Sequence, residues 1–150
     1  MCTGENDMLT LSINWLAVLV CVVISMVSGS LWYNPKTFFP IWWKGIGKTD
    51  KDDPGATTNM GVVWGLTVLS SLVQAIFIGL MVNWLGSQLP GGINIRNGAL
   101  VGLMLWAGVV APTYMVNKMF AGHGLKIWAI EVGNHLVNFV LFGMVFGLWR

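Results

Sequence analysis

Apolar residues fill four long stretches of the chain that contain no charged side chain. A bilayer core about 30 Å thick is crossed by roughly 20 helical residues, so each stretch is long enough for one crossing. The turn formers Gly86, Pro90 and Gly91 limit the second stretch to a single crossing. We therefore predict an all-α integral membrane four-helix bundle that forms one domain over residues 1–150. The predicted helices lie at about residues 13–33, 61–85, 97–120 and 125–149.

An aromatic segment lies between the first two predicted helices. Residues 37–47 read TFFPIWWKGIG and are followed by a polar run with both acidic and basic side chains. Tryptophan and phenylalanine beside a lysine favour the headgroup level of a bilayer, where the rings are half exposed to water. We predict a short interfacial helix or turn at about residues 38–46. It either anchors the chain or serves as a lid or a partner-docking surface.

The composition supports membrane residence and argues against other classes. Of all residues 55% are hydrophobic and only 9% are charged, whereas about a quarter are charged in a soluble domain. The eight Lys and Arg residues form no basic cluster interleaved with aromatics, so nucleic-acid binding is not supported. Cys2 and Cys21 are too few for a disulfide framework or a metal set, and their redox state is not readable from the sequence.

The distribution of Lys and Arg predicts the orientation of the helices. Lysines gather in the loops after the first and third predicted helices, whereas the opposite side has only Arg96 and Arg150. Because cytoplasmic loops are enriched in Lys and Arg, the aromatic segment is predicted to be cytoplasmic and both termini outside.

Small residues spaced four apart occur on every predicted helix. In lipid, such pairs let two helix backbones approach closely and pack. The pattern predicts a compact bundle, or a bundle that also dimerises. The pairs are Ser25 and Gly29, Gly61 and Gly65, Gly98 and Gly102, and Gly143 and Gly147.

Pro112 interrupts the third predicted helix. A proline inside a helix frees the carbonyl one turn earlier, here near Gly108, and bends the helix. Thr113, Tyr114 and Asn117 are close enough in sequence to bond the freed backbone or to line a gap. Pro112 is therefore either a hinge or a packing device.

A polar stripe on the fourth predicted helix is the candidate site. Glu131, His135 and Asn138 stand at i, i+4 and i+7, so they share one helix face. Asn134 flanks that face. Counted from Lys126 at 1.5 Å per residue, Glu131 lies roughly 8 Å and His135 roughly 14 Å along the helix, near the middle of the membrane. Possible partners from other helices are Gln74, Tyr114, Asn117 and Lys118.

Three hypotheses account for the stripe. It is an interhelical hydrogen-bond network with Glu131 paired or protonated and His135 neutral, or a relay in which the two titrate alternately. The third hypothesis is half of a metal site, which needs a second copy of the chain. We find no phosphate loop, zinc motif or nucleophile motif, and so predict no enzyme activity, no cofactor and no metal set within one chain.

Short motifs occur in a defined order along nearly the whole chain. They are INWLAVLV, GSLWYNP, WWKGIG and, at the end, GNHLVNFVLFGMVFGLWR. In this order they resemble the bacterial and archaeal membrane family called domain of unknown function 1761. The resemblance implies four helices, residence in a prokaryotic cell membrane, and no assigned activity. The residues that match are Asn14, Trp15, Gly29, Leu31, Trp32, Tyr33, Pro35, Gly133, His135, Leu136 and Trp149.

The chain departs from the family pattern at two members of the stripe. The pattern has a polar amide where this chain has Glu131 and an aromatic where it has Asn134. His135 is the stripe member that the resemblance retains, so a relay built on Glu131 is not implied by the family.

Two functions remain open from the sequence. One is a small structural or accessory subunit in the lipid bilayer, within a homo-oligomer or a larger membrane complex. The other is a small oligomeric transporter or channel, with a polar path along the fourth helix and Pro112 as its hinge. The direction that His135 faces distinguishes them, because a dry bundle centre favours the accessory role and a wet cavity favours transport.

Overall fold

The computed structural model describes residues 12–55 and 59–149. Cys2 and Arg150, which contribute to the predictions above, lie outside these residues. The described chain is all-helical and contains no strand. Its helices are α1 (Trp15–Trp32), α2 (Phe39–Gly45), α3 (Met60–Gln88), α4 (Ile95–Leu105), the π-helix η1 (Trp106–Val110), α5 (Ala111–Phe120) and α6 (Gly124–Leu148).

The four predicted transmembrane helices are present, and the aromatic segment contains α2. Four helices are long and apolar enough to cross a membrane, the third being the combined stretch Ile95–Phe120. The largest difference in bounds is at the end of α3, which continues to Gln88 rather than stopping near residue 85. Pro90 sets this end, because the residue before a proline disfavours the helical conformation, and Leu89 is extended with ψ 148°.

Asparagine side chains begin three of the long helices. Asn14 Oδ1 accepts hydrogen bonds from the backbone N–H groups of Leu16 and Ala17, at 3.0 and 3.1 Å. Asn59 caps α3 and Asn94 caps α4 in the same way. Each cap satisfies backbone donors that have no partner inside the helix and contributes about 1 kcal/mol.

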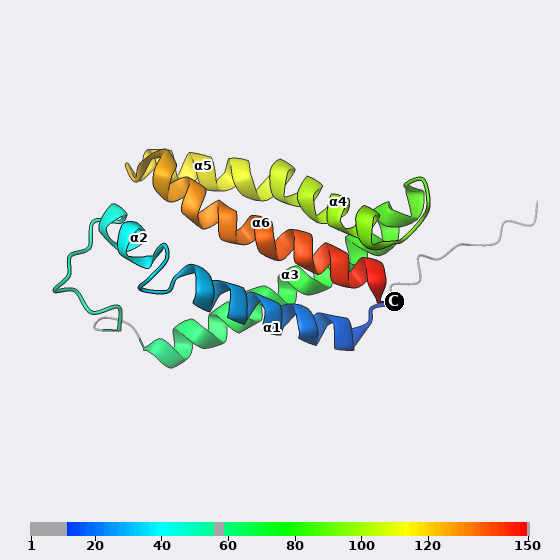
Figure 1. The fold of residues 1–150 in the computed structure, drawn as a ribbon, viewed down its shortest axis with the longest axis horizontal. Coiled ribbons are helices and arrows are strands. Elements are labelled where there is room, and N and C mark those ends of the chain that lie inside the picture. Colours follow the sequence, from blue (N-terminus) through cyan, green and yellow to red (C-terminus); the bar gives the residue numbers. More distant parts are fainter. Residues whose placement is uncertain (1–11, 56–58, 150) are drawn as a thin grey trace, which may run out of the picture.

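Helix α6 is the centre of the bundle. It contacts α1, α3, α4 and α5, and also the short α2. In Figure 1, α4 and α5 run as one long column along one side of α6, and α1 and α3 lie on its other side. Helix α2 lies at the end of the bundle where α1 finishes and α6 begins, opposite the end where α6 finishes.

Glycines bring the backbones of α4 and α6 into contact. A Cβ atom on Gly98 would collide with the carbonyl oxygen of Gly143, and one on Gly102 would collide with that of Phe139. A Cβ on Gly147 would collide with the backbone of Asn94. Two of the predicted small-residue pairs therefore face each other and close this half of the bundle.

The other two predicted grooves do not form in the way that the pattern indicated. A Cβ on Gly65 or Gly29 would meet nothing within 4 Å, and one on Gly61 would meet only the side chain that caps its own helix. Ser25 does pack, with its Oγ 2.5 Å from Ser71 Oγ on α3. Within one chain, therefore, the Gly61 and Gly65 pair of α3 meets no neighbouring helix, because spacing alone does not show which helix face packs.

The packed core occupies the half of the bundle away from α2. Its largest fully buried side chain is Phe142 of α6, and Gly79 of α3 makes room for the Phe146 ring. In the other half, α5 has no buried residue and the first buried residue of α3 is Ser71. The bundle therefore has a closed half and a looser half. Residues of the core are Ala17, Val18, Cys21, Ala75, Ile78, Val82, Val101, Phe139, Phe142 and Phe146.

The predicted interruption before Pro112 takes the form of a π-helix. The N–H of Ala111 bonds to the carbonyl of Trp106, five residues earlier, so the backbone widens in the turn before the proline. Pro112 has no N–H to donate, and its ring excludes the ordinary helical contact with the Gly108 carbonyl. The widened turn separates α4, which is closed against α6, from the loosely packed α5.

Candidate functional site

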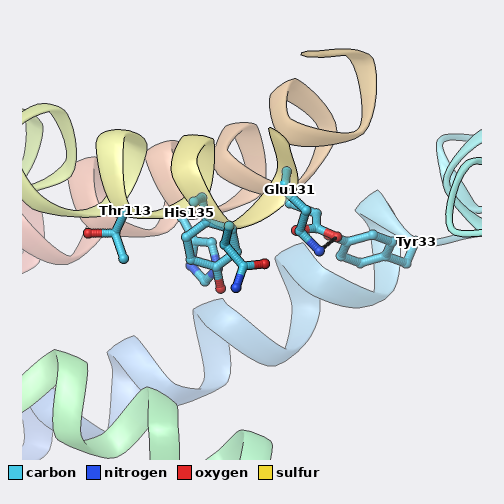
Figure 2. Close-up of a pocket in the computed structure, with 7 residues that line it drawn as sticks. Tyr33, Thr113, Glu131 and His135 are labelled. Carbon is cyan, nitrogen blue, oxygen red and sulfur yellow. Dashed lines mark hydrogen bonds and ion pairs between the residues drawn. The ribbon is translucent and has the colours of Figure 1, made fainter. Parts of the chain in front are cut away.

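A cavity of about 440 Å³ lies in the looser half, between the end of α1, α5 and α6. In Figure 2, Thr113, His135, Glu131 and Tyr33 follow one another from left to right along the cavity, between the ribbons of α5 and α1. Every lining residue has a polar group, which is unusual at a depth where lipid surrounds the protein. The lining residues are Tyr33, Thr113, Tyr114, Asn117, Lys118, Glu131 and His135.

An ion pair between α5 and α6 forms one part of the cavity wall. Lys118 Nζ lies 2.8 Å from Glu131 Oε1, and the two side chains are only 16% and 10% exposed. The indole N–H of Trp42, on α2, donates to the same Oε1 at 2.9 Å. Glu131 therefore joins the interfacial helix to the transmembrane bundle, and its charge is compensated where water is scarce.

His135 and Tyr114 form the second polar contact of the cavity. His135 Nε2 and the Tyr114 hydroxyl oxygen are 2.9 Å apart, and either group can donate in this hydrogen bond. Their ring centroids are 5.0 Å apart. His135 thus faces a polar cavity and not the apolar core around Phe142.

Several polar groups of the lining have hydrogen-bonding capacity that the described residues do not use. Both contacts of Glu131 are to Oε1, so Oε2 has no partner among the described side chains. Lys118 uses one of its three N–H donors in the ion pair. The Tyr33 hydroxyl and the Asn117 amide likewise have no hydrogen bond within the described chain, although both line the cavity. A cavity with this lining requires water or a polar ligand.

The residues after Pro112 are brought to the cavity. Thr113, Tyr114 and Asn117 all line it, and Thr113 Oγ1 also donates to the Val109 carbonyl at 2.6 Å. Lys118 reaches Glu131, as its sequence position indicated. On the helix these side chains recur after one turn, so a single face of α5 supplies them.

The polar stripe of α6 divides between two surroundings, which differs from the single face that the sequence indicated. Asn138 accepts a hydrogen bond from Ser28 of α1, at 2.5 Å, and donates to Asn134 at 3.4 Å. Asn134 is buried, and its Nδ2 has no partner among the described residues. These two asparagines belong to the contact between α1 and α6. Asn138 shares a helix face with Glu131 but lies about 10 Å further along α6, at the level where α1 packs against it.

Gln74 is not brought to the site. Its Nε2 donates to Ser70 of the same helix, at 3.2 Å. Helix α3 does not pack against α5, and no residue of α3 lines the cavity, so Gln74 does not reach the site.

Two functional residues were missed by the sequence argument. Tyr33 was considered only as the end of a helix, and Trp42 only as an interfacial anchor. Their rings meet edge to face at 5.2 Å, which places α2 beside the outer part of the cavity. The pattern of apolar and charged residues could not predict this contact between rings, because the contact depends on the path of the turn that follows α1.

Tryptophan also has a structural use inside the bundle that the sequence argument did not foresee. The indole N–H groups of Trp32 and Trp106 each donate at 2.8 Å to backbone carbonyls of α6, at Ile130 and Val132. Trp128 of α6 donates to the carbonyl of Ala111 at 2.9 Å. A tryptophan in the interior of an apolar stretch is the feature of the sequence that could have predicted these contacts, because its buried N–H needs a hydrogen-bond acceptor.

A metal site is not assembled by the described residues of one chain. They contain no group of three or more His, Cys, Asp or Glu side chains that could hold an ion. Glu131 Oε1 and His135 Nε2 are both engaged, by Lys118 and Tyr114 respectively. The half-site hypothesis would still require a second copy of the chain.

The sequence matches a known family over almost its whole length. Residues 16–147 match the family described as Protein of unknown function (DUF1761), and the chain belongs to this family. No curated protein and no solved structure matches the chain. Family membership and four membrane-capable helices fit an integral membrane protein whose role is unknown.

Proposed function

We propose that this protein binds a small polar solute in the cavity and functions as a transporter-type membrane protein. The observation that supports the proposal most directly is that His135 lines a polar cavity, with Tyr114 as its partner. Of the two functions left open by the sequence, a wet cavity favours solute binding over a purely structural role.

The shape of the bundle supports access from one side. Tyr33 directly follows the last residue of α1, and Lys118 stands two residues before the end of α5, so the cavity reaches the α2 end of the bundle. The glycine contacts between α4 and α6 close the opposite half. A site open to one side and closed to the other is the arrangement of a carrier in one of its two states. The widened turn before Pro112 is the hinge of this proposal.

The side on which α2 lies is proposed to be cytoplasmic. The Lys residues at this end of the bundle support this orientation through the positive-inside rule. Among them are Lys44 of α2, Lys48 after it and Lys126 in the first turn of α6. Both termini would then be outside, and the solute would enter the cavity from the cytoplasm.

Thiol labelling tests access to the cavity. In a Cys2→Ser background, we expect Thr113→Cys to react with a charged, membrane-impermeant thiol reagent added on the α2 side only. Val116→Cys is the matched control, since Val116 lies on the same helix, is 60% exposed and does not line the cavity. Equal protection of both cysteines from either side would contradict a solvent-connected cavity.

Flux measurements test the transport part of the proposal. In proteoliposomes with a pH-sensitive dye inside, we expect a pH-dependent flux that disappears in His135→Ala. A flux of the same size in His135→Ala would contradict the proposal that His135 takes part in transport.

An accessory subunit is the second candidate. The exposed apolar side chains of the first third of α3, such as Trp64 and Leu66, support it because a partner helix could cover them. Lipid chains cover such a surface equally well. Purification in native nanodiscs distinguishes the two, since a large membrane partner present in equal amount would favour the accessory role over a stand-alone transporter.

A further inference from the structure

We infer that the cavity takes a zwitterionic group, in which an ammonium and an anionic oxygen group lie a few ångströms apart. This inference rests on the proposed function, because it presupposes that the cavity binds a polar solute. It adds the chemical class of the ligand, and it follows from the charges and the unused hydrogen-bonding groups of the lining.

The lining already contains one positive and one negative side chain in contact. Lys118 and Glu131 are 2.8 Å apart and together add no net charge to the cavity. A ligand with one net charge would leave that charge uncompensated among side chains that are only 16% and 10% exposed. Uncompensated charge in such surroundings is strongly disfavoured. A zwitterion brings both signs and leaves the site neutral.

The free groups of the lining match the two ends of such a ligand. Glu131 Oε2 has no partner among the described side chains, whereas Oε1 holds both Lys118 and Trp42, so an ammonium can donate to Oε2 without breaking the ion pair. The Tyr33 ring beside Glu131 offers the same ammonium an aromatic face.

The anionic end of the ligand has donors on the neighbouring part of the wall. Lys118 keeps two N–H donors outside the ion pair, and the amide of Asn117 also lines the cavity. With the ligand in place, the four charged groups are Lys118, Glu131, the ligand's ammonium and its anionic group. In this order positive and negative charges alternate, so each charge lies beside two of opposite sign. The cavity volume of about 440 Å³ suits a small solute or a lipid headgroup.

Binding of size-matched probes to the purified full-length protein tests the inference. For a free solute, the probes are β-alanine, propylamine and propionate. For a headgroup, they are glycerophosphoethanolamine, ethylamine and diethyl phosphate, so that the zwitterion is neutral and each analogue carries one charge. By calorimetry in neutral detergent, we expect one or both zwitterions to bind about 10-fold more tightly than their singly charged analogues, a difference equivalent to about 1.4 kcal/mol.

Variants of the ion pair are expected to invert the preference. Glu131→Gln leaves an uncompensated positive charge and should favour propionate or diethyl phosphate, whereas Lys118→Met should favour the amines. Lys126→Met, which removes an exposed lysine of α6 outside the cavity, is the control and should keep the zwitterion preference. The swapped pair Lys118→Glu/Glu131→Lys keeps the site neutral, so it tests the inference even where a single variant fails to fold.

A lipid-binding experiment distinguishes the two possible sources of the ligand, a free solute and a lipid headgroup. Nanodiscs of phosphatidylethanolamine and of phosphatidylglycerol are compared by native mass spectrometry for lipid retained on the protein. Selective retention of phosphatidylethanolamine that is lost in Lys118→Met indicates a headgroup. A preference for β-alanine without lipid retention indicates a free solute.

The outcomes distinguish failure of the inference from failure of the proposed function. If neither zwitterion binds the natural protein more tightly than its singly charged analogues, and no phosphatidylethanolamine is selectively retained, the inference is overturned. With Thr113→Cys still labelled from the α2 side, the solvent-connected cavity survives that result. If Thr113→Cys is also protected, the proposed function fails as well.

Discussion

Replacing Gly98 with alanine would place a methyl group inside the contact between α4 and α6. The added Cβ would collide with the Gly143 carbonyl oxygen, and it would lie 3.1 Å from the Gly147 Cα. All these atoms belong to backbone, so no side-chain rotation relieves the contact. The two helices must separate, and the glycine contact that closes this half of the bundle opens.

The expected loss of stability follows from two opposing effects. Overpacking in a well-packed interior costs about 1 to 3 kcal/mol, and a backbone collision belongs at the upper end of that range. Alanine in place of glycine within a helix returns about 1 kcal/mol. The net destabilisation of Gly98→Ala is therefore about 2 kcal/mol, which is a change of about 30-fold in the unfolding equilibrium.

Unfolding by SDS in mixed micelles, followed by far-UV circular dichroism, measures this change. Gly65→Ala is the matched control, since a Cβ there meets nothing within 4 Å and only the gain in helix propensity remains. We expect Gly65→Ala to be slightly more stable than the natural protein and Gly98→Ala to be clearly less stable. Equal unfolding midpoints for the two variants would refute the close approach of α4 and α6.

Three further results are expected. Lys118→Met should lower stability in the same SDS assay more than the double variant Lys118→Met/Glu131→Gln does. Removing one member of a buried ion pair leaves an uncompensated charge, whereas the double variant leaves none. A double variant that is less stable than the single one would contradict this. Trp106→Phe should cost about 1 kcal/mol through loss of its hydrogen bond to α6, whereas no loss would show that the bond adds nothing. The N–H and hydroxyl of Thr49 hold the pKa of Asp52 below its ordinary value, so this turn is stabilised at neutral pH and loses that contribution as the pH falls through the lowered pKa. Thr49→Ala removes the hydroxyl and keeps the backbone N–H, so it should raise the pKa of Asp52 part of the way in an NMR titration. An unchanged value would refute the contribution of the hydroxyl.

The sequence anticipated part of the candidate site because helix spacing has local consequences. Glu131 and His135 are one turn apart, so both reach the same side of α6, and Pro112 directs attention to Thr113, Tyr114 and Asn117 on the next turns. The spacing did not predict that Asn138 would face α1, because that depends on where α1 crosses α6. Nor did it exclude Gln74, whose distance from the cavity depends on how α3 diverges from α5.

The interfacial segment shows the same division. Its aromatic residues and lysine predicted a short helix between the first two transmembrane helices, and α2 is present there. Its contact with the site is made by Trp42, which donates to Glu131 across 89 positions of sequence. A local sequence pattern cannot predict a contact between residues so far apart in the chain, so only the folded structure shows that α2 contacts the cavity.

The sequence by itself determined the class of this protein, because charges are excluded from a lipid core and the charge-free stretches have the length of a bilayer crossing. It also determined where three of the long helices begin, through asparagine caps, and where α3 ends, through the proline that follows it. The tertiary structure decided which small residues pack, which polar groups meet, and that a polar cavity exists at all. These depend on how far apart helices lie at each level of the bundle, which is the combined result of all their contacts. Hydropathy along a single chain does not specify those distances.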